Sequence, residues 1–342
     1  MKRSGLLFIW ITLGMVTAGA IFAPFLAPYQ PEDQARDFFY APPTAVHFFD
    51  EQGSFSVRPF IYDYARISDR PLYRATQEKL FLEFWVEGAE YRWLGATWDR
   101  HLFGVSASKK PVFLLGSDSL GRDQLSRLLY GMRFSLGVGL AGILFTLLVG
   151  VGLGSLAGYA GGIVDTLVMR TCDLFLSLPG LFLVLGLRAV VPLEISTATT
   201  FWLIVLIFTL IGWGSVTRVI RGQVLTLKER QHVLAAKVIG ASDWRVLIHH
   251  ILPLTSNYLV VQASVLLPLF ILGEITLSFL GVGVQEPGVS MGTLLNTATS
   301  LQALAQFRWL TAPVVVIFLT VLSFNLLGER LKALDRVRAR WW

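Results

Sequence analysis

The feature that most limits how this chain can fold is a series of long apolar stretches with few charges. A membrane-spanning helix needs about 20 largely apolar residues, because each residue rises about 1.5 Å through about 30 Å of hydrocarbon. Lipid offers no partner for a free backbone N–H or C=O, so such spans must be helical. The mean hydropathy of +0.60 agrees with a lipid solvent. The sequence predicts an all-α membrane protein with about six transmembrane helices, at residues 6–26, 134–157, 174–191, 200–213, 254–280 and 309–327.

The distribution of Lys and Arg predicts the orientation of these spans. Short cytoplasmic loops of membrane proteins carry an excess of both residues. If both termini are cytoplasmic, the short outer loops hold only Arg188 and Arg308, whereas basic residues crowd the inner loops and both tails. We therefore expect cytoplasmic termini. The N-terminal start also suits a secretory signal, but its apolar run continues to Leu26, so we expect an uncleaved anchor.

Several kinds of chemistry are not supported by the sequence. The net charge is +6, but the basic residues are spread through membrane-flanking loops, so we expect no nucleic-acid partner. Cys172 is the only cysteine, which leaves no intrachain disulfide and no thiol metal cluster. Neither Gly-x-x-x-x-Gly-Lys-Ser/Thr nor His-Glu-x-x-His occurs. We expect no catalytic residue, metal or cofactor on this chain, and any ATP chemistry must belong to another polypeptide.

One catalytic pattern provides an alternative. Gly-Val-Ser-Met-Gly at 288–292 has the form of a nucleophile elbow around Ser290. That motif requires a strand-to-helix turn and a histidine within reach. The histidines are expected either across the membrane, as His232, His249 and His250, or in the outer segment, as His47 and His101. An intramembrane serine hydrolase and a non-transporting membrane scaffold are the two alternatives to the interpretation below.

Residues 28–114 differ in character from the spans on either side, since they are rich in aromatic residues and balanced in charge. A disordered segment would have few aromatic residues. Leu82, Phe84 and Val86 alternate with other residues as they would along a strand. We predict a small β-rich extracytoplasmic cap between the first and second spans.

Two patterns belong to the second span. Residues 123–133 carry leucines on one side and charges elsewhere, which suits an amphipathic helix on the outer membrane surface; the alternative is a charged first turn of the span itself. Further on, Gly150, Gly154, Gly158 and Gly162 recur every four residues and would share one helix face. Small residues at this spacing let membrane helices approach closely. We expect this face to pack against another helix.

The fifth span contains two residues that are unusual inside a membrane. Pro268 removes a backbone donor and is expected to kink the helix. Glu274 is an ionisable group at a depth where charge is expensive, so it marks either a transport path or a structural hydrogen bond. We favour the structural bond and keep the path as the alternative.

The cytoplasmic loop 216–253 has the pattern of a short helical hairpin. Its residues up to Ile239 are good helix formers, and Gly240 can end this first helix. Ser242 or Asp243 can cap a second helix.

Other residues of this loop indicate a docking surface. Ala235 and Ala236 leave the first helix with a small, flat surface, and Pro253 is expected to stop the second helix where span five begins. A flat, basic, rigid hairpin suits docking to a soluble partner. Contact with anionic lipid is the alternative.

The hairpin resembles the EAA loop of ABC-importer permeases, through Ala235-Ala236-x-x-x-Gly240 followed by Leu252-Pro253. More narrowly, the chain is similar to the C-type, or second, permease subunit of oligopeptide, dipeptide and nickel importers. The matching segments cover the first span and nearly everything from Leu115 to Asp335. They include Lys228-Glu229-Arg230, Gly240-Ala241-Ser242-Asp243, Gly116-Ser117-Asp118-Ser119-Leu120-Gly121-Arg122-Asp123, Gly161-Gly162-x-x-Asp165, Met169-Arg170-x-x-Asp173, Leu277-Ser278-Phe279-Leu280-Gly281 and Phe324-Asn325-Leu326-Leu327-Gly328.

The resemblance implies a permease subunit, not an enzyme, in the bacterial inner membrane. Residues 1–27 would form the N-terminal tail and first helix, 28–114 an extracytoplasmic insertion, and 115–342 the permease core. A heterodimer of two related permeases would form the path through the lipid bilayer, two ABC ATPase subunits would bind the coupling loop, and an extracytoplasmic solute-binding protein would deliver the substrate. ATP-driven closure of the ATPases would move the hairpin and rock the spans between inward and outward access. Peptide is the leading substrate, with nickel, opines and short sugars open.

The same resemblance assigns candidate residues. Those for ATPase docking are Glu229, Ala235, Ala236, Gly240, Ala241, Ser242, Asp243 and Pro253. Those of the motif that leads into span two are Asp118, Gly121, Arg122 and Asp123.

This chain departs from the family pattern in two places. Leu234 stands where the motif has a glutamate, so that polar contact is absent, shifted to Glu229, or left to the partner permease. The cap is longer than expected in simple members, so no family role can be carried onto it. Our hypothesis is that the cap contacts the binding protein.

Overall fold

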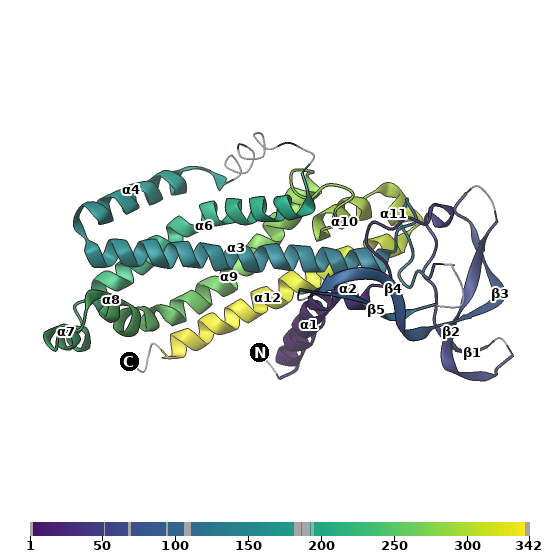
Figure 1. The fold of residues 1–342 in the computed structure, drawn as a ribbon, viewed down its shortest axis with the longest axis horizontal. Helices are drawn as coiled ribbons and strands as arrows, with labels where there is room; N and C mark the ends of the chain where they lie inside the picture. Colours follow the sequence, from purple (N-terminus) through teal and green to yellow (C-terminus); the bar gives the residue numbers. More distant parts are fainter. Residues whose placement is uncertain are drawn as a thin grey trace. The chain divides into compact units, whose positions relative to one another are not determined.

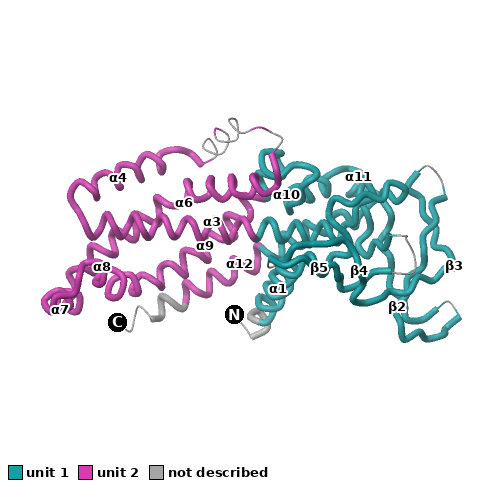
Figure 2. The backbone as a smooth tube through the Cα atoms, viewed as in Figure 1, with its two compact units in different colours: residues 1–136, 275–320 teal, residues 137–274, 321–342 magenta. Residues whose placement is uncertain are grey.

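The computed structural model describes residues 3–50, 52–67, 70–93, 95–105, 111–180, 186, 192 and 195–338. The chain divides into two compact units (Figure 2). Unit 1 comprises Met1–Leu136 and Ile275–Thr320, and unit 2 comprises Gly137–Glu274 and Val321–Trp342.

Four helices are long and apolar enough to cross a membrane: Gln124–Ala160, Thr197–Leu227, Asp243–Phe279 and Arg308–Ala333. Leu7–Ile21 is a shorter apolar helix. With the strands of the cap, these helices confirm the predicted fold class. The third predicted span, 174–191, lies largely outside the described residues.

The helices of unit 1 come from both of its sequence segments. They are α1 (Arg3–Ile21), α2 (Ala23–Leu26), η1 (Arg36–Phe38), α10 (Met291–Ala298), α11 (Leu301–Ala305) and η3 (Arg308–Thr311), together with the first parts of α3 (Gln124–Ala160) and α12 (Ala312–Arg338) and the end of α9 (Leu252–Phe279). Helix α1 packs closely on α3, because Gly19 has no side chain: a Cβ there would lie 3.2 Å from Cε of Met132.

The cap of unit 1 contains five strands in two antiparallel sheets (Figure 1). One sheet has the order β1-β2-β3, from His47–Phe49, Phe55–Arg66 and Tyr73–Phe81; the other pairs β4 (Glu83–Trp93) with β5 (Ala96–Gly104). Ile61, Leu80, Leu82 and Val112 form an apolar core beneath them. Phe84 and Val86 lie in β4 as predicted, whereas Leu82 lies between two strands.

Unit 2 contains the remainder of α3 and a set of helices around it (Figure 1). These are α4 (Gly162–Ser177), α6 (Thr197–Leu227), α7 (Gln231–Val238), α8 (Asp243–Arg245), the π-helical turn η2 (Val246–Ile251), and parts of α9 (Leu252–Phe279) and α12 (Ala312–Arg338). Helix α4 was not predicted, and the fourth predicted span, 200–213, covers only the first half of the longer α6.

The glycine face of α3 packs against α6, as the sequence predicted. A Cβ at Gly150 would lie 2.6 Å from the Val216 side chain, and one at Gly158 would lie 2.8 Å from the Arg221 carbonyl oxygen. Gly162 is a correction: α3 ends at Ala160, so Gly162 begins α4 with a φ of +57° and does not share this face.

The predicted surface helix at 123–133 is wrong, and the alternative is confirmed. The segment is the first part of α3, which continues without interruption to Ala160. The physical reason is that Asp123 and Arg127 are buried and bonded within unit 1, so they need no water-facing helix surface.

Candidate functional site

Two groups of predicted residues form well-defined structures, one in each unit. In unit 1, the segment that leads into α3 is a tight turn around Asp118. The Asp118 carboxylate oxygen Oδ1 accepts hydrogen bonds from the backbone N–H groups of Leu120 at 2.8 Å and Arg122 at 3.0 Å. Gly121 has a φ of +72°, and a Cβ there would lie 2.0 Å from the carbonyl oxygen of Ala35. Only glycine fits this turn.

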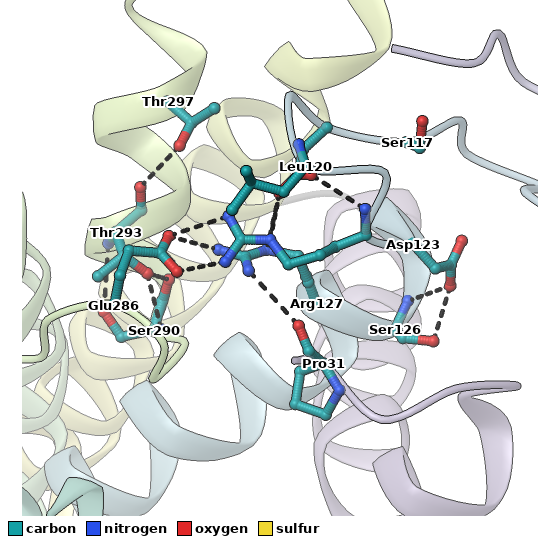
Figure 3. Close-up of polar contacts among 12 residues, drawn as sticks. Pro31, Ser117, Leu120, Asp123, Ser126, Arg127, Glu286, Ser290, Thr293 and Thr297 are labelled. Atoms are coloured by element: carbon teal, nitrogen blue, oxygen red, sulfur yellow. Dashed lines mark hydrogen bonds and ion pairs between the residues drawn. The ribbon is translucent and has the colours of Figure 1, made fainter. Parts of the chain in front are cut away.

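Arg122 from this turn and Arg127 from α3 both bond the carboxylate of Glu286. Figure 3 shows Arg127 beside Glu286 and Pro31. Arg122 donates from Nε to Asp118 Oδ2 at 2.7 Å and also bonds both carboxylate oxygens of Glu286. Arg127, at the start of α3, donates from Nη2 to Glu286 Oε1 at 2.9 Å and from Nη1 to the Pro31 carbonyl at 3.4 Å. The cluster of Asp118, Arg122, Arg127 and Glu286 is termed the arginine cluster below.

The arginines of the arginine cluster are buried, whereas its glutamate is partly exposed to the surroundings of the protein. Both arginines and Asp118 are buried, whereas the Glu286 side chain is 50% exposed. Burial alone would raise the pKa of Glu286, but the guanidiniums of Arg122 and Arg127 outweigh it, so that pKa is lowered. Glu286 is therefore an anion that holds the loop after α9 to the start of α3.

Sequence reasoning missed Glu286 as a site residue. The family-like segment that begins at Leu277 continues beyond Gly281 as x-Gly283-Val284-Gln285, and Glu286 directly follows it. Glu286 is also the only acidic residue between Glu274 and Glu329. The one available signal was that Glu286 is an isolated acidic residue, while Arg122 and Arg127 had no predicted partner.

Asp123 has a separate role at the start of α3. Its Oδ2 accepts hydrogen bonds from the backbone N–H and the hydroxyl of Ser126, both at 2.7 Å, so it caps the helix. Burial raises the pKa of Asp123 to about 6, although the bonds from Ser126 act in the opposite direction. Asp118 and Arg122 thus belong to the arginine cluster, and Asp123 stabilises the helix beside it.

In unit 2, the hairpin that was predicted at 216–253 is confined to residues 228–253, because residues 216–227 belong to α6. Its first helix, α7, begins only at Gln231, because the chain turns at 228–230 after α6. It ends in a Schellman motif: the Ala241 N–H donates to the Ala236 carbonyl, and the Gly240 N–H donates to the Lys237 carbonyl, both at 3.0 Å. Gly240 has the φ of +87° that this motif requires. Its predicted role as a helix stop is confirmed.

The other docking candidates differ in exposure. Ala236 is buried, whereas Glu229, Ala235, Gly240, Ser242 and Asp243 are exposed and Ala241 is half-buried. Ser242 occupies the N-cap position of α8, but its side chain makes no capping bond. The Asp243 carboxylate instead accepts a hydrogen bond from the Tyr159 hydroxyl near the end of α3, and Lys237 Nζ lies 3.8 Å from the same oxygen. Asp243 thus fixes the hairpin to α3.

The hairpin exposes apolar side chains in addition to the basic ones that the sequence predicted, since Arg230, Lys237 and Arg245 are exposed as well. Val238 and Ile239 are 86% and 85% exposed, Trp244 is 71% exposed, and Leu234 is also exposed. Leu234, Val238, Ile239 and Trp244 are termed the hairpin patch. Leu234 and Val238 are four residues apart on α7 and so share one face, and exposed apolar side chains that share a face are typical of an interaction surface.

Pro253 does not stop a helix, which corrects the prediction. A continuous helical stretch runs from Asp243 to Phe279, and Pro253 is the second residue of α9 within it. The turn just before it, η2, is π-helical, and the Leu252 N–H donates to the Leu247 carbonyl. A π turn displaces the preceding carbonyls from their α-helical positions, which relieves the clash that proline meets inside an α-helix.

Two motif aspartates join α4 to α6. Asp165 accepts both Nε and Nη2 of Arg221, at 2.6 and 2.5 Å, and Asp173 accepts Nη2 of Arg218 at 2.5 Å. The Arg221 guanidinium lowers the pKa of Asp165. The resemblance had singled out these aspartates without indicating their partners.

Pro268 and Glu274 lie in α9 as predicted. Glu274 is fully buried, which favours the structural alternative over an open path. Pro268 lacks the N–H that would bond the Ser264 carbonyl in a regular helix. A Cβ at Gly328 of α12 would lie 3.1 Å from that carbonyl oxygen, so glycine is needed for α12 to approach it.

Ser290 is used as a helix cap. It is fully buried, and its hydroxyl accepts hydrogen bonds from the N–H groups of Gly292 and Thr293 at 3.1 and 3.3 Å. The His101 ring contacts the carbonyls of Ala27 and Ala89 instead. Ser290 therefore has a structural role at the start of α10. Among the described residues, no group of His, Cys, Asp and Glu could hold a metal ion.

Sequence comparison relates this chain to membrane components of bacterial transport systems. A family model described as "Binding-protein-dependent transport system inner membrane component" matches residues 150–336. The glutathione transport system permease protein GsiD of Pectobacterium atrosepticum is 40% identical over 65% of this chain and 71% of its own length. The dipeptide transport system permease protein DppC of Bacillus subtilis is 38% identical over 64% of this chain and 67% of its own.

Two further relatives, both dipeptide-type permeases named DppC, match almost the whole chain. The di/tripeptide transport system permease protein DppC of Pseudomonas aeruginosa is 31% identical over 97% of this chain and 86% of its own length. An alignment of that extent must include most of the cap.

Proposed function

Because this chain belongs to the family of inner membrane components of binding-protein-dependent transport systems, we propose that it is the C-type permease of an importer for short peptides. The observation that carries the substrate class is the 97% coverage by a relative named for di- and tripeptides, which takes in the cap as well as the permease core. The glutathione and dipeptide relatives support the same class, since glutathione is itself a short peptide.

The proposed assembly contains this chain, a second related permease, two ABC ATPases and an extracytoplasmic binding protein. Residues 115–342 are its permease core, 1–27 its first helix and tail, and 28–114 its cap. Both termini face the cytoplasm. Transport proceeds by alternating access, and ATP hydrolysis takes place on the partner subunits.

The ATPases dock on the hairpin, with the hairpin patch as the apolar centre of the contact. Glu229, Ala235 and Ser242 surround it as exposed neighbours, whereas Ala236 and Gly240 fix its shape. The bond from Tyr159 to Asp243 connects the docked hairpin to α3, and the helical continuity through Pro253 connects it to α9. A push on the hairpin therefore reaches two spans at once.

The docking is tested by Val238→Asp and Ile239→Asp, since both side chains are exposed and neither change disturbs packing inside the chain. We expect each variant to insert normally, to lose ATPase co-purification, and to lose uptake of a labelled dipeptide. His232→Asp, an exposed substitution on the same helix, is the control and should retain both. Full ATPase binding by both variants would refute the docking surface.

The substrate class is tested separately, by deleting the gene and measuring uptake of labelled dipeptides, tripeptides and Ni²⁺. Loss of peptide uptake alone, restored by the wild-type gene, is expected. Loss of Ni²⁺ uptake with normal peptide uptake would contradict the peptide assignment and leave the family assignment unchanged.

The cap is proposed to contact the binding protein. Deleting residues 30–108 should abolish uptake and weaken binding of the substrate-loaded binding protein. Unchanged uptake after this deletion would refute that role.

A further inference from the structure

We propose that the β4–β5 hairpin of the cap rests on the bilayer at the level of the lipid headgroups, with Trp85, Trp93 and Trp98 as its contact surface. The proposal goes beyond the transport function, and all of its residues belong to unit 1.

The first step is the lipid-facing side of α1. Ile9, Leu13 and Val16 are buried, whereas Met15 and Ile21 are among the apolar side chains that remain exposed. The 19 residues of α1 extend about 28 Å at about 1.5 Å per residue, close to the thickness of the hydrocarbon layer. The exposed side of α1 therefore faces lipid, and its end at Ile21 reaches the headgroup level.

The second step is that the β4–β5 hairpin is attached at this end. The Trp93 indole N–H donates to the Ile21 carbonyl at 3.1 Å, and the Trp93 ring lies 5.3 Å from that of Phe22. The Trp85 ring lies 5.1 Å from that of Phe25. The tryptophans thus continue the lipid-facing side of α1 into the cap.

The third step is the two-sided character of the hairpin tip. Tyr91 pairs with Trp98 and Arg92 pairs with Thr97, so Trp93 and Trp98 share the face of Tyr91 while Arg92 and Thr97 share the other. The rings of Trp93 and Trp98 are 6.5 Å apart. One face of the tip is aromatic and the other polar.

The chemistry of these side chains selects lipid as the partner. Trp85 and Trp98 are 62% and 48% exposed, which is unfavourable in water. Tryptophan is enriched at membrane–water interfaces, where its ring meets hydrocarbon and its N–H meets polar groups. Continuity with the lipid-facing side of α1 favours the bilayer over a protein partner.

The test places one environment-sensitive fluorophore at a time on the full-length protein in proteoliposomes, in a Cys172→Ala background that removes the only native cysteine. The labelled variants are Trp85→Cys, Trp98→Cys, Thr97→Cys as the opposite-face control, and Met15→Cys as the depth reference. Quenchers are lipids with a nitroxide at the headgroup end of the chain, lipids with a nitroxide deeper in the chain, and aqueous iodide.

We expect probes at positions 85 and 98 to lose more fluorescence to the shallow nitroxide than to the deep one or to iodide. The probe at position 15 should respond most to the deep nitroxide, and the probe at 97 to iodide. Quenching at 85 and 98 by iodide alone would overturn the proposal. Protection from all three quenchers would also overturn it, because the surface would then be covered by protein.

Discussion

The contact between α3 and α6 gives the sharpest prediction of the structure, because two glycines two residues apart on α3 have opposite surroundings. A Cβ at Gly154 would lie 2.6 Å from the Thr217 carbonyl oxygen and 2.9 Å from Cβ of Ile220. A Cβ at Gly152 would meet nothing within 4 Å. The first distance is closer than any real Cβ contact, and a backbone carbonyl cannot rotate away as a side chain can.

The magnitude follows from two opposing effects. Forcing one extra carbon into a well-packed contact costs about 1–3 kcal/mol. Replacing a helical glycine by alanine gains up to about 1 kcal/mol. Gly154→Ala should therefore lower the free energy of unfolding by about 1–2 kcal/mol, whereas Gly152→Ala should leave it unchanged or raise it by up to about 1 kcal/mol.

Both variants sit on the same helix at nearly the same depth, so each controls for the other. The assay is reversible denaturant unfolding of the purified protein in lipid–detergent micelles, combined with peptide uptake in cells. Equal stability of the two variants would refute the reasoning that α3 and α6 are held at backbone contact.

Three further predictions concern the polar groups. Asp165→Arg and Arg221→Asp should each lower thermal stability by about 1 kcal/mol, and the two together should recover most of it, since the pair is partly exposed and bidentate. Burial raises the pKa of Asp123 from 3.8 to about 6, so the folded state binds this proton more tightly than the unfolded state, and the resulting contribution to the free energy of unfolding is complete below about pH 4 and is lost as the pH rises through 6. Asp123→Asn cannot lose a proton there, so paired melting curves should show it gaining about 3 kcal/mol relative to the wild type between pH 4 and 7. Glu286→Gln should cost about 1–3 kcal/mol in unfolding free energy, less than a fully buried pair, because Arg127 is buried but Glu286 is half exposed; an unchanged melting curve would contradict this.

Local sequence patterns predicted the parts of the fold that depend on local physics. The four-residue spacing of Gly150, Gly154 and Gly158 placed them on one helix face, and that face meets α6. Gly240 was recognised as a helix stop because few other residues adopt a positive φ, and the Schellman bonds follow from it. The aromatic composition of 28–114 indicated a folded cap, and five strands lie there.

Features that depend on partners distant in sequence were not predictable. Glu286 is separated from Arg122 by 164 positions, and no spacing rule connects a loop after α9 to a turn before α3. Helix α4 was not predicted, because Asp165 and Asp173 interrupt the apolar pattern of its segment and the sequence does not show that Arg221 and Arg218 pair with them. The arginine partners of both aspartates lie on another helix, α6, so the pattern of this segment alone could not identify them.

Pro253 shows a second reason why a sequence-based prediction failed. A proline ends a regular α-helix, and the sequence carries no sign that the preceding turn is π-helical. Once η2 widens the helix, the same proline is accommodated, and α8 and α9 form one continuous element. The hairpin is therefore continuous with a span, and the helix end that was predicted at Pro253 is absent.

Leu234 bears on how the proposed docking contact is made. In the family motif a glutamate occupies this position, which suggests a polar contact that the present chain would lack. Leu234 and Val238 are four residues apart on α7 and therefore share one face, and both are exposed together with Ile239. A carboxylate at position 234 would interrupt this apolar surface. Glu229 precedes α7 and lies outside its helical face, so it cannot take the same place. The proposed docking face is thus apolar, leucine at 234 is consistent with it, and we expect the partner ATPase to present an apolar groove to it.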